Sequence, residues 1–458
     1  MVRVVILGGS DAGISAALRI REVAATADVT VVLADAFPNY SICGLPFYLS
    51  GEVPDWQQLA HRTADDIERA GVRLQLNTVA QAINPTDQTV ALKAHDQVRS
   101  ELRYDRLVIA TGAVSIRPRI AGLDLPGVFP LRRMEDSFAV DRYIHTHAPQ
   151  TAVIIGGGYI GVEMADALTR RGLAVTVVEH GDSVLKTVDP SLGQLVRAEL
   201  ERSGVSVVTG VASTAIEPAG QQLTVLGTPG FARTADLVLV AVGVRPRVDL
   251  AVTAGVALGA TGAIRVTRAM ETSIPNIFAA GDCVETWHRL LNQPTYLPLG
   301  STAHKQGRVA GANAAGGSQH YAGSLGTQVV KVFELAIART GLRDSEARAA
   351  GFDPVTVELA PWDHKVYYPG AQVLHIRVTG DQHTGLLLGA QMVGPHTAEV
   401  AKRIDIFATA LFHRMTVDAL NDLDLSYTPP LSSPWDPVQL SAQAWTQVVE
   451  HGRGRNPA

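Results

Sequence analysis

One cysteine lies where a thiol could do redox chemistry. Cys43 belongs to the segment NYSICGLP (residues 39–46), in which glycine and proline mark a turn just after a predicted strand. That position is near the carboxyl edge of a parallel sheet, where ligands bind. A lone cysteine is more often a small buried side chain, so the residues around Cys43 leave both roles open. For Cys283, the second of the two cysteines, we expect the buried role.

A glycine-rich motif, GGGYIG, predicts a dinucleotide site. Gly156 would make the turn, Gly158 would let the backbone approach a pyrophosphate, and Gly161 would allow a helix to pack closely on a strand. The pyrophosphate would then meet the N-terminus of that helix. Glu179 ends the next predicted strand, where a carboxylate accepts hydrogen bonds from ribose hydroxyls and repels a 2′-phosphate. This favours NADH, while the adjacent His180 leaves NADPH open.

A weaker copy of the motif, GGSDAG, has serine at its middle glycine position. The acid expected at the end of the next strand is displaced, because Leu33 stands there and Asp35 follows two residues later. The strand ending in ATG and the segment IFAAGD strengthen the prediction, since the aspartate of IFAAGD could bond a ribityl hydroxyl of FAD; an ordinary turn aspartate is the alternative. The residues predicted to bind FAD are Gly8, Ser10, Asp11, Ala12, Gly13, Asp35, Thr111, Gly112 and Asp282.

The elements that must position these residues occur twice. In each half a strand leads into the glycine turn, a helix follows, and a second strand completes a βαβ unit. The first helix is predicted from about Gly13 and the second ends at about Arg171. The predicted strands are Arg3–Leu7, Val29–Leu33, Tyr104–Gly112, Ala152–Ile155, Ala174–Glu179 and Asp236–Gly243. Two such units predict two dinucleotide sites.

The pattern changes from about Tyr321. Alternating apolar residues predict antiparallel strands at Gln372–Val378 and Gly385–Val393, and an amphipathic helix at about Ala398–Arg414. The sequence therefore predicts the α/β class with two Rossmann-like domains and a third, α+β domain. The expected limits are 1–120 with 247–322 for the FAD domain, 121–246 for the NAD(P) domain, 323–449 for the third domain, and 450–458 for a disordered tail.

Composition excludes several classes of function. The 458 residues carry a net charge of −5, which does not suit general binding to nucleic acid or to an anionic membrane. Two cysteines are too few for a disulfide framework, so we expect a cytoplasmic protein. The sequence has no apolar run long enough to span a membrane and no metal-binding motif. His145, His147 and His364 are expected at the surface.

Together the motifs resemble those of the flavoprotein pyridine nucleotide–disulfide oxidoreductases. The similarity is greatest to the single-cysteine branch that holds CoA-disulfide reductases, NADH oxidases and NADH peroxidases. It covers nearly the whole chain and rests on GGSDAG, SICGLP, YDRLVIATG, GGGYIGVE, DLVLVAVGVRP, NIFAAGD and DLSYTPPLSSPWDPV. The resemblance implies a glutathione-reductase-like fold, a homodimer held by the third domain, FAD, NADH or NADPH, and a small disulfide or persulfide as substrate.

The resemblance also implies roles for individual residues. Cys43 would lie beside the flavin with a lowered pKa and cycle between a thiolate and a mixed disulfide, persulfide or sulfenate. Tyr427 and either Tyr367 or Tyr368 would reach the active site across the dimer, or would be interface aromatics with satisfied hydroxyls. Glu163 would position the nicotinamide. Further cofactor contacts are implied for Arg132, Tyr159, Ile160, Gly243, Ser301, Thr302 and Ala303.

The chain departs from the family pattern at its redox centre. Tyr48 replaces the second cysteine of the two-cysteine reductases, which excludes an internal redox disulfide. Asp11 stands where the oxidases and peroxidases carry a histidine. An ionised acid beside a thiolate raises the pKa of the thiol, so Asp11 argues against peroxide chemistry, although it could simply cap the helix.

The substrate pocket departs as well. The residues at the family's contact positions are Ser15, Arg19, Glu22, Asn39, Ile42, His304 and Trp435, of which we expect Ser15, Arg19, Asn39 and His304 to bind substrate. Fewer cations would weaken the binding of CoA phosphates, unless Arg19 and Arg21 compensate. We therefore expect an NAD(P)H-dependent reductase of a small disulfide or persulfide such as CoA disulfide. An NAD(P)H oxidase or peroxidase that uses a cysteine sulfenate is the alternative, and a flavin-bearing redox sensor is the third possibility.

Overall fold

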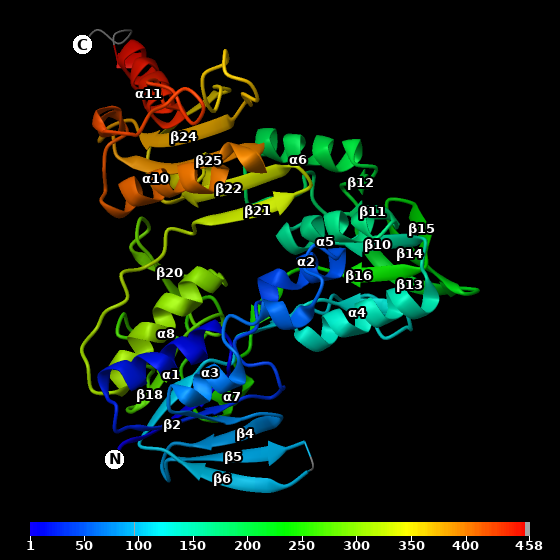
Figure 1. The fold of residues 1–458 in the computed structure, drawn as a ribbon, viewed down its shortest axis with the longest axis vertical. Helices are drawn as coiled ribbons and strands as arrows, with labels where there is room; N and C mark the ends of the chain where they lie inside the picture. Colours follow the sequence, from blue (N-terminus) through cyan, green and yellow to red (C-terminus); the bar gives the residue numbers. More distant parts are fainter. Residues whose placement is uncertain (96, 454–458) are drawn as a thin grey trace.

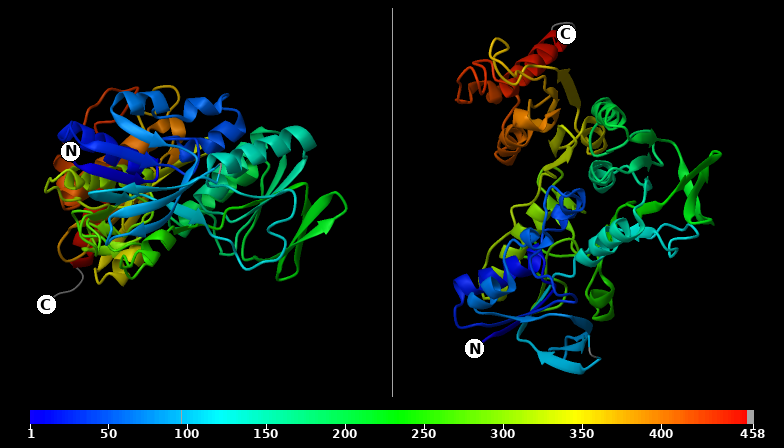
Figure 2. Two further views of the ribbon diagram at one scale, coloured as in Figure 1. Left: turned by 90° about the horizontal axis from the view of Figure 1, so that it is seen from below. Right: turned by 45° about the vertical axis from the view of Figure 1, so that its right-hand side comes forward.

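The computed structural model describes residues 1–95 and 97–453. Its elements form three units, each built on one five-stranded sheet. Figure 1 shows the N-terminal unit at one end of an elongated molecule, the C-terminal unit at the other, and the central unit beside both. The second view in Figure 2 shows the same arrangement from another side.

The N-terminal unit contains a parallel sheet with the order β18-β7-β1-β2-β3. Its strands are apolar on both faces because helices α1 and α8 pack together on one side and a three-stranded sheet, β4–β6, lies nearby. The strands are β1 (Arg3–Leu7), β2 (Asp28–Val32), β3 (Val72–Gln75), β4 (Thr78–Asn84), β5 (Thr89–Ala94), β6 (Arg99–Arg103), β7 (Arg106–Ile109), β8 (Ala113–Ser115), β17 (Val244–Pro246), β18 (Ile277–Ala279), β19 (Thr286–His288) and β20 (Gln293–Thr295). The helices are α1 (Asp11–Val23), α2 (Leu45–Ser50), α3 (Ala64–Arg69), α7 (Asp249–Thr253) and α8 (Gly300–Ala314).

The central unit repeats this design with a parallel sheet of order β12-β11-β10-β16-β9. An antiparallel sheet of three strands, β13–β15, adjoins it. The strands are β9 (Val128–Pro130), β10 (Thr151–Ile155), β11 (Ala174–Val178), β12 (Ser206–Val208), β13 (Ala212–Ala219), β14 (Gln222–Thr228), β15 (Phe231–Ala235) and β16 (Leu237–Val240). The helices are α4 (Met134–His147), α5 (Tyr159–Arg170) and α6 (Pro190–Arg202).

The C-terminal unit is an antiparallel sheet of order β21-β22-β25-β24-β23 packed against helices. Its elements are β21 (Gln328–Val332), β22 (Leu335–Gly341), α9 (Asp344–Ala349), β23 (Pro354–Leu359), β24 (His375–Asp381), β25 (Leu387–Pro395), α10 (Val400–Phe412) and α11 (Pro437–Arg453). The α/β class with an added α+β unit is therefore confirmed. The tail prediction was wrong for residues 450–453, because α11 continues through them; residues 454–458 lie outside the described residues.

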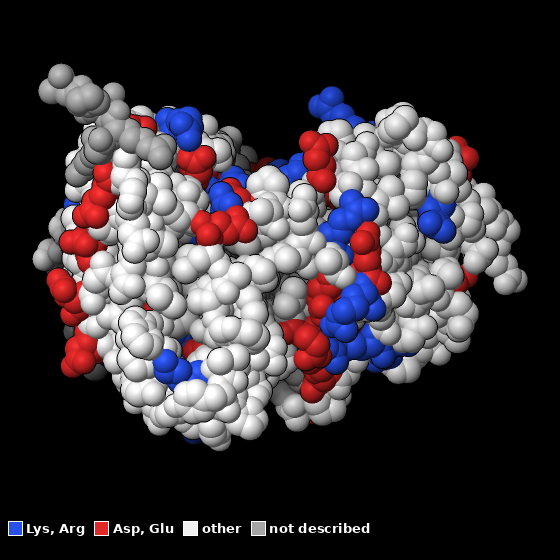
Figure 3. Space-filling model, turned by 90° about the horizontal axis from the view of Figure 1, so that it is seen from above, with Lys and Arg blue, Asp and Glu red and all other residues white. Residues whose placement is uncertain are grey.

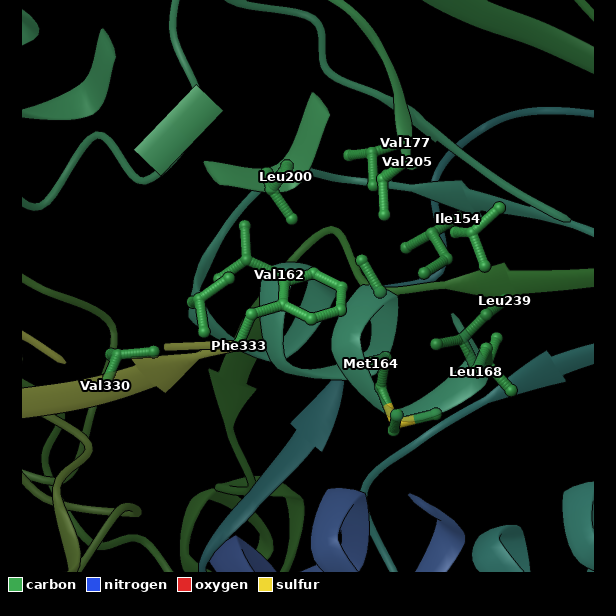
Figure 4. Close-up of a cluster of buried hydrophobic side chains, with 14 of the residues drawn as sticks. Ile154, Val162, Met164, Leu168, Val177, Leu200, Val205, Leu239, Val330 and Phe333 are labelled. Atoms are coloured by element: carbon green, nitrogen blue, oxygen red, sulfur yellow. The ribbon is translucent and has the colours of Figure 1, made fainter. Parts of the chain in front are cut away.

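The central and C-terminal units share one hydrophobic core. Phe333, from the turn between β21 and β22, points toward Val162 of α5, with Leu200 and Ile154 nearby (Figure 4). The buried carboxylate of Asp166 accepts a hydrogen bond of 2.8 Å from the Phe333 N–H. This shared core holds α5, which begins at the predicted dinucleotide turn, against a second unit of the protein.

Candidate active site

The turn between β10 and α5 has the geometry that its three glycines predict. Gly156 has φ +110°, and a Cβ there would lie 2.4 Å from the carbonyl oxygen of Ala241. At Gly161 a Cβ would lie 1.9 Å from the Gly156 carbonyl oxygen, whereas no protein atom lies within 4 Å of one at Gly158. The first and third glycines thus allow close packing, and the second faces open space.

A cavity of about 490 Å³ opens beside this turn. Several of the predicted cofactor residues share it, although they come from different elements. Its lining includes Gly156, Gly158, Tyr159, Ile160, Glu179, His180 and Gly243. The Glu179 carboxylate accepts hydrogen bonds from the N–H groups of Gly157 (2.8 Å) and Gly181 (2.7 Å). Its Oε1 also lies 3.4 Å from Nζ of Lys186, so the acid at the end of β11 has a basic neighbour.

The turn between β1 and α1 repeats the design of the β10–α5 turn. Gly8 has φ +118°, and a Cβ at Gly13 would lie 1.9 Å from the Gly8 carbonyl oxygen. Helix α1 begins at Asp11, two residues before the predicted start, and Ser10 is its N-cap. The proposed capping role of Asp11 was therefore wrong, because this side chain already belongs to the first helical turn.

A cavity of about 410 Å³ follows the carboxyl edge of the first sheet. Of the residues predicted to bind FAD, it brings together Gly8, Ser10, Asp35, Thr111, Gly112 and Arg132. Asp35 thus lies with the glycine turn despite its displaced position in the sequence. Burial raises the pKa of the Asp35 carboxyl, which is opposed by the hydrogen bond from the Phe37 N–H.

A second group of predicted cofactor residues lies beside Asp282. The Asp282 carboxylate accepts a 2.7 Å hydrogen bond from Nη2 of Arg132, which joins the end of the first sheet to the segment that leads into α4. Helix α8 begins at Gly300, so Ser301, Thr302 and Ala303 form its first turn.

Cys283 is fully buried and its thiol donates to the carbonyl oxygens of Ile109 and Ala280. The expected packing role of Cys283 is confirmed.

Cys43 is exposed, in a short 3₁₀ turn directly before α2. Removal of water by the surrounding protein, with the charges of Glu163 and Asp11, raises the pKa of its thiol, while the guanidinium of Arg132 lowers it. The expected lowering depends in part on bound flavin, so it stays a prediction. The pKa is raised in the protein because burial removes water from the thiol, and because the carboxylates of Glu163, Asp11 and Asp282 act on it against the guanidinium of Arg132.

Glu163 lies on α5, which packs against α2, the helix after Cys43. Burial and the neighbouring carboxylate of Asp166 raise the pKa of Glu163 to about 8, against a lowering effect of Lys331. The side chain is therefore mostly protonated at neutral pH. A neutral carboxylic acid can donate a hydrogen bond as well as accept one, and this acid lies near enough to Cys43 to affect the pKa of the thiol.

Of the predicted substrate residues, Ser15 and Arg19 lie on α1 and His304 lies on α8, which packs against α1, while Asn39 lies in the segment after β2. The Ser15 hydroxyl and Nδ1 of His304 are 2.8 Å apart. Glu22 binds Arg19 at 2.8 Å and Arg308 at 3.2 Å, so an acid offsets two cations on this surface. Asn39 is 4% exposed, and its side-chain oxygen has no hydrogen-bond partner among the described residues.

Two sequence-based expectations fail, one on α1 and one in the C-terminal unit. Arg21 does not join Arg19, because its guanidinium donates to the backbone carbonyls of Ala27 and Ala70. His364 is 9% exposed and contacts Asp363 at 2.9 Å, whereas His145 and His147 are at the surface as expected. A surface position was wrong for His364 because Asp363 gives its ring a buried partner.

The three tyrosines lie together on the C-terminal unit. Tyr367, Tyr368 and Tyr427 are 71%, 43% and 45% exposed. Desolvation and a hydrogen bond to Tyr367 raise the pKa of the Tyr427 hydroxyl. The electrostatic neighbours of Cys43 come from the other two units and include none of these tyrosines, so within one chain the tyrosines meet each other and not the thiol.

Sequence reasoning missed several residues of the site. Arg308 meets Glu22, which is 286 positions away, and His61 lies close enough to Asp11 to lower the pKa of that carboxyl. Lys186 follows Glu179 by seven residues, and this basic residue after the strand-end acid was a usable signal. Lys331 gave no signal, because its partners, Glu52 and Asp166, come from distant elements.

Among the described residues, no helix is long and apolar enough to cross a membrane, and no group of three or more His, Cys, Asp or Glu side chains could hold a metal ion. A family model for pyridine nucleotide-disulphide oxidoreductases matches residues 2–307. The model of the dimerisation domain of the same enzymes matches residues 327–437.

The chain is 35% identical over 441 residues to a CoA-dependent NAD(P)H sulfur oxidoreductase of Pyrococcus abyssi, which covers 96% of this chain and 97% of the relative. It is 30% identical over 443 residues to coenzyme A disulfide reductase of Staphylococcus haemolyticus, at 96% and 98% coverage. Both relatives match almost end to end.

Solved structures with the same fold include enzymes of the same kind as these relatives. The reduced CoADR-RHD of Bacillus anthracis has a TM-score of 0.95 at 32% identity, covering 98% of this chain and 81% of that one. A NAD-dependent persulfide reductase from A. fulgidus has a TM-score of 0.94 at 36% identity, covering 98% and 84%. The chain belongs to the pyridine nucleotide-disulphide oxidoreductases, a family of enzymes that use flavin and NAD(P)H.

Proposed function

We propose that this protein is an NAD(P)H-dependent flavoprotein that reduces a small disulfide or persulfide, with CoA disulfide as the first candidate, through Cys43. The observation that carries the proposal is the position of this thiol. Cys43 is exposed, and residues from the helices that follow both dinucleotide turns, Asp11 of α1 and Glu163 of α5, lie near enough to change its pKa. The relatives named as sulfur, persulfide and CoA disulfide reductases support this substrate class.

The residues of the N-terminal unit fit FAD. The cavity of about 410 Å³ runs from the glycine turn past Asp35 to Arg132. Glycine is required at position 8 of this turn, because a Cβ there would clash with the carbonyl group of Ala110. Asp35 would bond the ribose, Asp282 the ribityl chain, and the first turn of α8 the flavin ring. When bound, FAD would accept a hydride from NAD(P)H and supply two electrons to the sulfur centre.

Cys43 supplies the nucleophile. Its thiolate attacks one sulfur of the disulfide RSSR, forming a mixed disulfide with Cys43 and releasing RS⁻. Two electrons and a proton then break this mixed disulfide, which restores the Cys43 thiolate and releases RSH. Glu163, mostly neutral at pH 7, would orient the nicotinamide side, and Arg132 would offset negative charge near the thiolate.

The helices α1 and α8 present the substrate surface in this proposal. The Ser15–His304 pair and the buried Asn39 would bind the polar part of the substrate, while Arg19 and Arg308 would bind anionic groups. Because Glu22 pairs with both arginines, the surface is less positive than two free arginines would make it. A phosphorylated thiol such as CoA would have to compete with this carboxylate.

The nicotinamide cofactor would bind in the central cavity. The open space at Gly158 leaves room for the pyrophosphate. Glu179 would bond the adenine ribose of NADH, and Lys186, 3.4 Å away, would offset the repulsion that Glu179 exerts on the 2′-phosphate of NADPH. We therefore propose that the enzyme accepts both cofactors, with NADH preferred.

We also propose a homodimer. The dimerisation-domain match covers residues 327–437, and this region exposes an apolar surface made of Trp362, Val366, Tyr367, Tyr368, Tyr427, Leu431 and Trp435. A second copy would cover this surface and carry its tyrosines toward Cys43. A free redox thiol and a low-molecular-weight thiol product both suit the reducing cytoplasm, where we place the protein.

The test compares two reactions of the flavin-loaded enzyme. Cys43→Ser is expected to lose at least 100-fold in NADH-dependent reduction of CoA disulfide, while NADH-dependent reduction of ferricyanide, which needs no thiol, stays near wild type. Cys283→Ala is the matched control, because Cys283 is buried and only packs. Full disulfide turnover by Cys43→Ser would end the proposal.

Measurements of oxygen uptake distinguish the proposed disulfide reductase from the alternative, an NAD(P)H oxidase. An oxidase would consume O₂ in step with NADH whether or not CoA disulfide is present. We expect slow O₂ consumption that the disulfide suppresses, because Asp11, near Cys43, disfavours a cysteine sulfenate.

A further inference from the structure

Two loops of the C-terminal unit carry the three tyrosines. We call residues 360–372 the first tyrosine loop and residues 423–436 the second tyrosine loop. The loops meet through the Tyr367–Tyr427 hydrogen bond and through a 3.3 Å hydrogen bond from the Lys365 N–H to the Pro429 carbonyl. Nζ of Lys365 also lies 4.5 Å from the centroid of the Trp435 ring, which is 60% exposed. Both loops are largely exposed on their outer side, so these contacts give them little support.

A single buried arginine joins the loops from the inner side. Arg403 of α10 is 6% exposed. Its Nη1 donates to Oδ2 of Asp436 at 2.8 Å, and its Nη2 donates to the carbonyl oxygens of Asp363 (2.8 Å) and Leu431 (3.3 Å). Asp363 belongs to the first tyrosine loop, and Leu431 and Asp436 belong to the second.

The two aspartates close their own loops. Oδ1 of Asp363 accepts hydrogen bonds of 2.8 Å from the N–H groups of His364 and Gln372, which lie at opposite ends of the loop's exposed part. Asp436 accepts hydrogen bonds of 2.8 Å from the Ser432 hydroxyl and from the Val438 N–H at the start of α11. Each aspartate therefore fixes the ends of its own loop, and Arg403, which contacts both loops, fixes the position of one loop relative to the other.

This arrangement is better suited to fixing geometry than to adding stability. A buried ion pair must overcome a large desolvation penalty, and apolar residues of similar volume often stabilise a protein as well or better. The planar guanidinium, in contrast, imposes fixed directions on its acceptors. Here it orients one carboxylate and two backbone carbonyls, all within the tyrosine loops.

We propose that Arg403 is a positioning residue for disulfide reduction, holding the two tyrosine loops so that Tyr427 and Tyr367 or Tyr368 are presented together to the active site. The inference rests on the proposed function, in which these hydroxyls act on the sulfur chemistry. Reduction of the flavin by NADH would not need them. Loss of Arg403 should therefore affect one half of the catalytic cycle and leave the other intact.

The experiment uses the flavin-loaded dimer of Arg403→Met and Arg403→Lys. For Arg403→Met, the kcat for CoA disulfide should fall at least tenfold, with the ferricyanide reductase rate within twofold of wild type. Arg403→Lys restores the charge but not the planar fork, so its loss should be intermediate. If Arg403→Met does not assemble, Arg403→Lys serves as the test. A lower ratio of the CoA disulfide rate to the ferricyanide rate than in wild type would support the inference, and an unchanged ratio would contradict it.

A matched control separates positioning from stability. Val378→Ala removes fully buried volume from β24 in the same unit, away from both tyrosine loops. It should lower the melting temperature without changing the ratio of disulfide to ferricyanide rates. The inference is wrong if Arg403→Met leaves this ratio unchanged while Tyr427→Phe lowers it. If the wild-type dimer itself does not reduce CoA disulfide, persulfide or related disulfides, the proposed function fails instead.

Discussion

At the scale of residues, the site combines one thiol with carboxylates that come from different elements. Asp11 and Glu163 both raise the pKa of Cys43, against the lowering effect of Arg132. Each of these residues belongs to a sequence motif. The direction in which the pKa of Cys43 shifts depends on how Cys43, Asp11 and Glu163 are placed relative to one another in the folded protein. No local pattern contains that information.

Glu163 should make stability depend on pH. Its pKa is about 8 in the folded protein and about 4.5 in the unfolded chain, so the native state holds a proton that the unfolded state releases between these values. Stability from this group is full below about pH 4.5 and is lost as pH rises through 8, on the order of 5 kcal/mol in all.

Glu163→Gln removes this dependence. In urea unfolding of the enzyme without nicotinamide, the difference in unfolding free energy between Glu163→Gln and wild type should rise in favour of the variant from pH 5 to pH 9. A difference that stays constant over this range would show that Glu163 is ionised in the folded protein.

Lys186 should affect one cofactor only. Lys186→Met removes the cation beside Glu179, so kcat/KM for NADPH should fall about 2- to 5-fold, the upper part of the range expected for one exposed charge pair. The value for NADH should change less than twofold, and Lys186→Arg should retain NADPH use. Equal losses with both cofactors would place Lys186 outside the 2′-phosphate site.

At the scale of elements, the glycine turns are the best predicted part of the protein. The expected strand Arg3–Leu7 is found with the same limits, and Ala152–Ile155 begins one residue earlier, because apolar runs and glycine spacing are local signals. Element ends in the C-terminal unit differ by two or three residues, since the ends of antiparallel strands depend on their partners. The disorder predicted for 450–453 failed because α11 packs through Val449 and then simply continues.

Two glycines of the β10–α5 turn should respond differently to alanine. Gly158→Ala should fold like wild type and raise the KM for NADH at least tenfold, because its Cβ enters open space beside the cavity. Gly161→Ala should lower the unfolding free energy by about 1–3 kcal/mol, since its Cβ would meet the Gly156 carbonyl at 1.9 Å. Steady-state kinetics and urea unfolding check the pair, and similar effects of both variants would contradict the assigned roles.

At the scale of the whole molecule, the central unit is fixed to the C-terminal unit by charged side chains as well as by the shared core. Asp189, just before α6, receives hydrogen bonds from Arg377 at 3.0 Å and Gln391 at 2.7 Å. Seen from the C-terminal end, side chains of both signs gather in a band between the two lobes (Figure 3). These partners lie about two hundred positions apart in sequence, so only the fold reveals them.

The apolar surface of the tyrosine loops should hold two copies together. Wild type is expected to sediment at twice the chain mass of 48.6 kDa. The double substitution of Leu431→Glu and Trp435→Glu, at side chains that are 65% and 60% exposed, should yield monomers with ferricyanide activity and no disulfide reduction. Val252→Glu, at an apolar side chain of the N-terminal unit that is 50% exposed, should stay dimeric. A dimeric double variant would place the interface elsewhere.

The central claim, that electrons leave through a covalent bond to Cys43, can be tested by mass spectrometry of the intact enzyme and its peptides. Incubated with CoA disulfide without reductant, the enzyme should gain the mass of one CoA per chain on the peptide containing Cys43 and none on that of Cys283. Addition of NADH should remove this mass and release free CoA. An unmodified Cys43, or an adduct that NADH does not discharge, would contradict the account.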